Sequence, residues 1–135
     1  IPHELIIRDL GHSRQEIHTC MAEIYTYLEQ KYPHQKKGLF LSNDTHAISL
    51  LHMIVRKHGC LPDTYRLIGF DDSPAASDAI IPISTVGQQI DKIAYAAMEL
   101  LVSLMEERKK RRPTPQTELV HKNITPVLIR RDTSD

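Results

Sequence analysis

The sequence predicts an α/β domain built on a doubly wound parallel sheet. Short apolar runs that end in small polar and acidic residues, at 39–42 and 66–70, have the length of buried parallel strands. Segments with the apolar spacing of amphipathic helices alternate with these runs along the chain. Because strands and helices alternate, the sheet is expected to be parallel and covered by helices.

The first elements are a short strand and an amphipathic helix. Residues 5–7 can form a strand. Ser13 and Glu16 have the spacing of a capping box, in which hydroxyl and carboxylate satisfy free amides at a helix start. An apolar stripe at intervals of three and four follows, and Pro33 is expected to end this helix.

A second strand–helix unit follows at 39–59. After the strand at 39–42, Asp44 or Thr45 can cap a helix that Gly59 ends in a left-handed conformation. The apolar positions of this helix predict its core face, which comprises Ala47, Ile48, Leu51, Ile54 and Val55.

The second half contains three further extended pieces and two helices. A strand at 66–70 precedes a short helix at 73–79, which starts with a serine cap and a proline. A strand at 83–86 leads to the longest apolar stripe, at 90–105, and basic residues at its end suit the helix dipole. The last β-rich run lies at 127–130.

Composition argues against several functional classes. The chain has 135 residues, of which 41% are hydrophobic and 25% charged, with 17 basic and 17 acidic side chains. This balance creates no overall field that attracts nucleic acid or an anionic membrane. No apolar run approaches the roughly 20 residues that span a bilayer. Cys20 and Cys60 lack metal-type spacing, so reduced thiols in a cytosolic protein are expected.

Polar side chains follow two of the predicted strands. Asn43 and Asp44 come after one strand, and Asp71 and Asp72 come after another. Since ligands of open α/β sheets bind at the carboxyl ends of strands, these residues are the first candidates for a site. Neighbours on a strand face opposite ways, so Asp72 is expected to be structural, and Asp44 is interpreted as a helix cap.

Other groupings of reactive residues are interpreted as structural. His46, His52 and His58 recur every six residues, which places successive rings about 120° apart on a helix and disfavours a shared metal. The basic run at 108–112 has no interleaved aromatic residues, so it is interpreted as a solvated helix end. Cys60 has no adjacent base. We therefore expect no catalytic residue, no metal and no cofactor.

Five segments in register resemble the LacI/GalR family of bacterial transcription regulators. They lie at 40–47, 59–63, 67–72, 83–88 and 127–133, and their order and spacing match over most of residues 38–133. The resemblance implies an effector-binding core of two α/β lobes, similar to the type I periplasmic sugar-binding proteins. It also implies an N-terminal helix-turn-helix headpiece.

The resemblance also implies a division of the chain. Residues 1–86 correspond to the C-terminal lobe, residues 87–124 to a segment that crosses into the N-terminal lobe, and residues 125–135 to a return strand and tail. The chain starts without an initiating methionine or a signal-peptide pattern, as an excised start would. Because the resemblance covers only the later part of the core, the headpiece and most of the N-terminal lobe are expected to be absent. The stripe at 90–105 would then be an exposed association surface.

Four residues align with effector-contacting positions of the family. Asn43 can donate to and accept from sugar hydroxyls, and the Asp71 carboxylate can accept from two of them. His12 corresponds to an aromatic residue that packs on the ligand, although it also suits an exposed loop. Ile90 corresponds to an apolar contact from the crossing segment, although it also fits the hydrophobic staple before a helix.

Three functional hypotheses follow. The first is the effector-sensing part of a cytoplasmic repressor, without membrane contact. In this homodimer a sugar or related polar metabolite changes the angle between lobes, and operator DNA is bound only through the headpiece. The second is a free-standing periplasmic sugar receptor. The third is a doubly wound enzyme, such as a phosphatase that uses Asp71, although the sequence has no glycine-rich phosphate loop.

Overall fold

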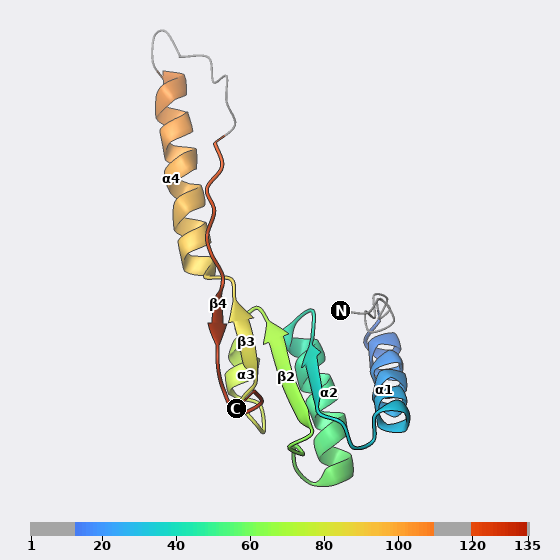
Figure 1. The fold of residues 1–135 in the computed structure, drawn as a ribbon. Coiled ribbons are helices and arrows are strands. Elements are labelled where there is room, and N and C mark those ends of the chain that lie inside the picture. Colours follow the sequence, from blue (N-terminus) through green and yellow to red (C-terminus); the bar gives the residue numbers. More distant parts are fainter. Residues whose placement is uncertain (1–12, 110–119, 135) are drawn as a thin grey trace. The chain divides into compact units, whose positions relative to one another are not determined.

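The computed structural model describes residues 13–109 and 120–134. The chain forms two compact units. The first comprises residues 1–86 and 128–135 and contains the sheet with helices α1, α2 and α3 (Figure 1). The second comprises residues 87–127 and contains helix α4 (Ile90–Lys109) and the described residues 120–127. The predicted strand at 5–7 lies outside the described residues.

Among the described residues, the predicted parallel sheet is confirmed for three of four strands, and the last strand runs in the opposite direction (Figure 1). Its strands are β1 (Lys37–Phe40), β2 (Tyr65–Phe70), β3 (Ser84–Gly87) and β4 (Val127–Ile129), in the order β1-β2-β3-β4. The pairs β1–β2 and β2–β3 are parallel, with Leu39 opposite Leu67 and Phe70 opposite Val86. Strand β1 begins and ends two residues earlier than the apolar run predicts.

Helix α1 (Arg14–Lys31) begins with the predicted capping box. The Ser13 hydroxyl accepts from the Glu16 N–H, and the Glu16 carboxylate accepts from the Ser13 N–H. Helix α2 (Asp44–His58) ends at Gly59, whose φ of 79° is the left-handed conformation that the sequence predicts. Helix α3 (Pro74–Ser77) starts after Ser73 with the expected proline, but it is shorter than predicted.

The predicted N-cap of α2 is wrong. Asn43, rather than Asp44 or Thr45, caps the helix, and its side-chain oxygen accepts from the His46 N–H at 2.9 Å. The Asp44 side chain is unavailable for capping because it turns into the protein interior and bonds to Ser73 and Thr85.

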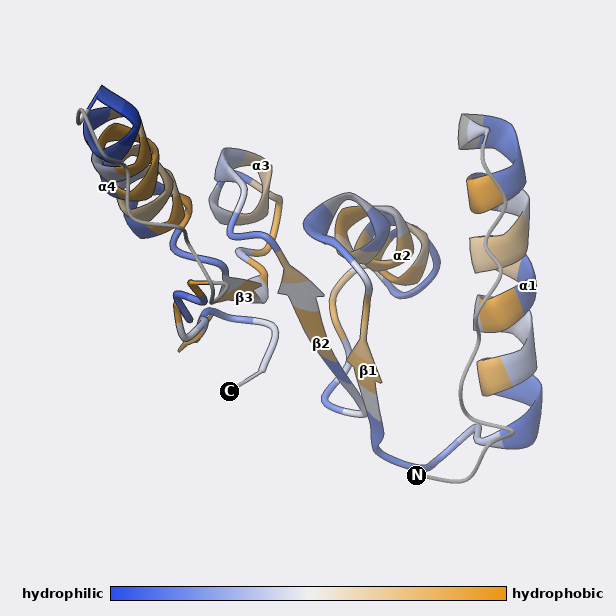
Figure 2. Cartoon of the chain, turned by 90° about the horizontal axis from the view of Figure 1, so that it is seen from above, coloured by the Kyte–Doolittle hydropathy of each residue, from blue (hydrophilic) through white to orange (hydrophobic). Residues whose placement is uncertain are grey.

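The core lies between α2 and the sheet. Helices α2 and α3 lie on the same face of the sheet (Figure 2), and alternate residues of β2 are buried beneath them. The buried side chains of the core are Met21, Tyr25, Ala47, Leu50, Leu51, Ile54, Tyr65, Leu67, Ala76 and Ile83. Three of the five positions predicted for the core face of α2 are fully buried, and Ile48 and Val55 pack at its margin.

A polar cluster around Glu29 joins α1 to α2 and to the first two strands. The Tyr65 hydroxyl donates to the Glu29 carboxylate at 2.5 Å, and the Lys57 and Lys37 ammonium groups lie 3.5 Å and 3.8 Å from it. The Tyr65 hydrogen bond is the main cause that lowers the pKa of Glu29, and Lys57 and Lys37 add to the effect. Burial raises the pKa of the Tyr65 hydroxyl.

The lowered pKa of Glu29 predicts a loss of stability in acid. A carboxyl whose pKa is lower in the folded state stabilises the fold above its unfolded pKa of about 4.3, and the contribution disappears as the pH falls through the folded value. Glu29→Gln should therefore reduce stability at pH 7 and flatten its acid dependence. Glu23→Gln, at an exposed position of the same helix, is the control. Urea unfolding at a series of pH values measures the free energy of unfolding. The same pH dependence of this free energy in wild type and Glu29→Gln would refute the prediction.

Candidate functional site

Asn43 lies between the carboxyl end of β1 and the first turn of α2. Its backbone is extended, with φ −158° and ψ 170°, and its side chain is half-buried. The cap uses only the side-chain oxygen, so the amide nitrogen keeps two donors that a ligand could accept from. The predicted site residue therefore has a structural role and a chemical group suited to binding.

Asp71 and Asp72 lie in a sharp turn directly after β2. Their φ values are 111° and 54°, in the region that favours glycine. Such conformations cost on the order of 1–3 kcal/mol each and persist only where neighbouring groups hold them. Both acids lie beyond the end of the strand, so the alternation that predicts opposite faces does not apply to them.

Three successive backbone N–H groups hold this turn. They are Asp71 N–H to the Val86 carbonyl at 3.0 Å, Asp72 N–H to the Thr85 hydroxyl at 3.3 Å, and Ser73 N–H to the Asp44 carboxylate at 2.7 Å. The acceptors come from β3 and from the first residue of α2. The turn that carries Asp71 is therefore fixed by two neighbouring elements.

Asp44 is a buried carboxylate at the first position of α2. Only 1% of the residue is exposed, and its two oxygens accept from the Thr85 hydroxyl at 2.6 Å and from the Ser73 N–H. Its place at a helix N-terminus also favours negative charge. A Cβ atom at Gly69 would overlap Oδ1 of Asp44, so the absence of a side chain there is what lets the carboxylate approach β2.

Asp72 has the structural role that the sequence predicts. Its carboxylate accepts from the Arg131 guanidinium at 2.7 Å, and the same guanidinium donates to the Ile83 carbonyl at 2.8 Å. Arg131 follows β4, and its backbone also exchanges hydrogen bonds with the Ser84 hydroxyl. The C-terminal residues thus hold Asp72 in place.

The other two predicted contacts belong to other parts of the chain. His12 lies outside the described residues. Ile90 is the first residue of α4, in the second unit, and 58% of it is exposed. The hydrophobic staple requires a residue before the cap, whereas Ile90 is itself helical.

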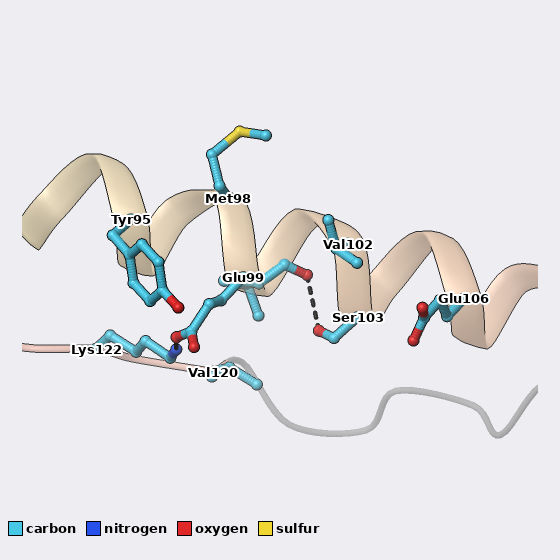
Figure 3. Close-up of a pocket in the computed structure, with 9 residues that line it drawn as sticks. Tyr95, Met98, Glu99, Val102, Ser103, Glu106, Val120 and Lys122 are labelled. Carbon is cyan, nitrogen blue, oxygen red and sulfur yellow. Dashed lines mark hydrogen bonds and ion pairs between the residues drawn. The ribbon is translucent and has the colours of Figure 1, made fainter.

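A groove in the second unit was not foreseen from the sequence. It has a volume of about 730 Å³ and lies between α4 and residues 120–122 (Figure 3). The Glu99–Lys122 ion pair, at 2.9 Å, crosses it. The remaining lining comprises Tyr95, Met98, Leu100, Val102, Ser103, Glu106 and Val120. Of the predicted ligand residues that the structure describes, none lines this groove.

The described residues contain neither a metal-binding cluster nor a membrane-spanning helix. Within 13–109 and 120–134, no group of three His, Cys, Asp or Glu side chains is placed to hold a metal ion. In the same part of the chain, no helix has the length and apolar character needed to cross a membrane.

The sequence is similar to sugar-operon repressors. Residues 5–133 match the family described as periplasmic binding protein-like domain. The ribose operon repressor of Bacillus subtilis is 29% identical over 82 residues, which cover 61% of this chain and 24% of the repressor. The ribose operon repressor of Escherichia coli K12 is 25% identical over 100 residues, covering 74% and 28%. The chain thus spans about a quarter of the length of these relatives.

Solved structures show the same fold. A LacI family transcriptional regulator from Lactobacillus casei with bound sucrose has a TM-score of 0.67 at 21% identity, covering 98% of this chain and 46% of that one. A LacI family regulator from Arthrobacter in complex with lactose has a TM-score of 0.69 at 21% identity, covering 87% and 41%.

The contact between Gly69 and Asp44 yields a stability prediction. Gly69→Ala should destabilise the protein by about 1–3 kcal/mol, because the new methyl group displaces a buried carboxylate and its partners. Gly38→Ala is the matched control, since a Cβ at that strand position meets nothing within 4 Å. Thermal and urea unfolding measure both variants, and equal effects of the two substitutions would contradict the role given to Gly69.

Proposed function

Since the chain belongs to the periplasmic binding protein-like family, as an effector-binding domain of the LacI/GalR type, we propose that it supplies one half of a sugar site in a transcriptional repressor. The other half would come from a second lobe of the longer protein. The curated relatives, which are named as repressors of the ribose operon, of arabinose metabolism and of the sucrose operon, support a sugar as the effector.

One observation carries the proposal. Two side chains with complementary chemistry follow two adjacent parallel strands, Asn43 after β1 and Asp71 after β2. The Asn43 amide nitrogen can donate to a sugar hydroxyl, and the exposed Asp71 carboxylate can accept from two hydroxyls. Carboxyl ends of neighbouring parallel strands meet at one edge of the sheet, which is where ligands of open α/β sheets bind.

The proposed mechanism couples this site to DNA. Residues 1–86 and 125–135 form a C-terminal lobe, and residues 87–124 cross to the other lobe. A sugar held between lobes changes their angle and thereby the placement of a DNA-binding headpiece. The full-length protein would act as a cytoplasmic homodimer. The lack of any buried residue in the 20-residue helix α4 supports packing of this crossing segment against a further part of the assembly.

The binding roles can be separated from the structural ones by conservative substitutions. Asn43→Asp keeps the capping oxygen and removes the amide donors. Asp71→Asn keeps the size of the side chain and suits a positive φ better than alanine does. In the full-length protein each substitution should weaken the binding of the best sugar by about ten- to hundredfold, or about 1–3 kcal/mol. Melting temperatures should stay close to that of wild type.

Calorimetry with ribose, arabinose, glucose, sucrose and lactose measures these affinities. Asp63→Asn, at an exposed position of the α2–β2 loop, is the control and should bind like wild type. Wild-type affinity in both Asn43→Asp and Asp71→Asn would remove the two residues from the site. If the folded wild-type protein bound none of the five sugars, the proposed effector class would be wrong.

A further inference from the structure

We propose that Asp44 and Thr85 form a buried positioning pair, which holds the turn carrying Asp71 and thereby sets the affinity for the effector without touching it. This inference rests on the proposed function. Thr85 is fully buried, Asp44 is 1% exposed, and their side chains are joined by a hydrogen bond of 2.6 Å.

The turn needs outside support because its own sequence does not favour its shape. Asp71 and Asp72 are both in the positive φ region, and neither is a glycine. The pair provides acceptors for two of the next N–H groups, with the Thr85 hydroxyl accepting from Asp72 and the Asp44 carboxylate from Ser73. Without these acceptors, the strained conformation loses two of the groups that hold it.

The Thr85 hydroxyl both accepts and donates a hydrogen bond. Its oxygen accepts from the Asp72 N–H while its O–H donates to Asp44 Oδ1, so one hydroxyl bonds to both partners. The other carboxylate oxygen reaches Ser73 at 2.7 Å. The carboxylate therefore connects the start of α2 to the turn after β2.

The same carboxylate links the two proposed ligand contacts. Asp44 directly follows Asn43, which caps α2, and its oxygens bond to groups that hold the segment after Asp71. The two residues lie about thirty positions apart in sequence, yet the same buried carboxylate lies next to one of them and helps to hold the turn of the other. A ligand that bonds to both would meet a preorganised arrangement, which lowers the entropic cost of binding.

Three substitutions test the pair in the full-length protein. Thr85→Val removes the hydroxyl at nearly constant volume, whereas Thr85→Ser keeps it. Thr133→Val is the matched control, because Thr133 is equally buried, donates to the Leu67 carbonyl at 2.8 Å and accepts from the Ser84 N–H at 2.9 Å. Calorimetry with the tightest of the five sugars gives affinity, and hydrogen exchange of peptides covering 70–75 gives the mobility of the turn.

We expect Thr85→Val to weaken binding about tenfold and to speed exchange at 71–73, while Thr85→Ser and Thr133→Val bind like wild type. In an Asp71→Asn background, Thr85→Val should cause little further loss, because it acts through Asp71. Additive losses, equal losses in Thr85→Val and Thr133→Val, or no faster exchange of the turn would overturn the inference. Failure of wild type to bind any sugar would refute the proposed function. Hydrogen exchange at 71–73 in wild type and Thr85→Val would then show whether the pair holds the turn.

Discussion

The buried Asp44 carboxylate is the constraint on which the carboxyl edge of the sheet depends. A carboxylate removed from water must find polar partners, and here the partners are a hydroxyl from β3 and a backbone N–H from the turn after β2. These hydrogen bonds hold three elements around the Asp44 carboxylate, and the close approach of the carboxylate to β2 requires a glycine at position 69. The start of α2, the end of β2 and the middle of β3 therefore cannot be placed independently.

Each of the two candidate ligand residues is followed by a neighbour whose side chain is bonded within the fold. In the pair Asn43–Asp44, the second residue is buried and structural, and the first has an amide nitrogen that capping does not use. In the pair Asp71–Asp72, the second residue bonds to Arg131, and the first is exposed. In each pair a residue used by the fold sits beside a residue suited to a ligand. A rigid scaffold next to a binding group is what makes a hydrogen-bonding site selective.

Local sequence signals predicted the elements but not the network that joins them. The capping box at Ser13, the left-handed stop at Gly59 and the apolar period of α2 depend on residues close in sequence, and the structure has all three. The cap of α2 was misassigned because Asn43 and Asp44 both suit a cap locally. The partners that draw Asp44 inward are Ser73 and Thr85, 29 and 41 residues further along the chain. The positive φ values at Asp71 and Asp72 were also missed, because no glycine marks the turn and the groups that hold it are distant in sequence.

The groups at the ends of β1 and β2 are proposed to bind a sugar. The most direct measurement is a crystal structure of the full-length protein with the sugar that binds most tightly. If these groups bind it, we expect sugar hydroxyls within about 2.7–3.2 Å of the Asn43 amide nitrogen and the Asp71 carboxylate, with the turn at 71–73 unchanged. A sugar bound elsewhere, for example in the groove along α4, with neither residue in contact, would contradict the proposal.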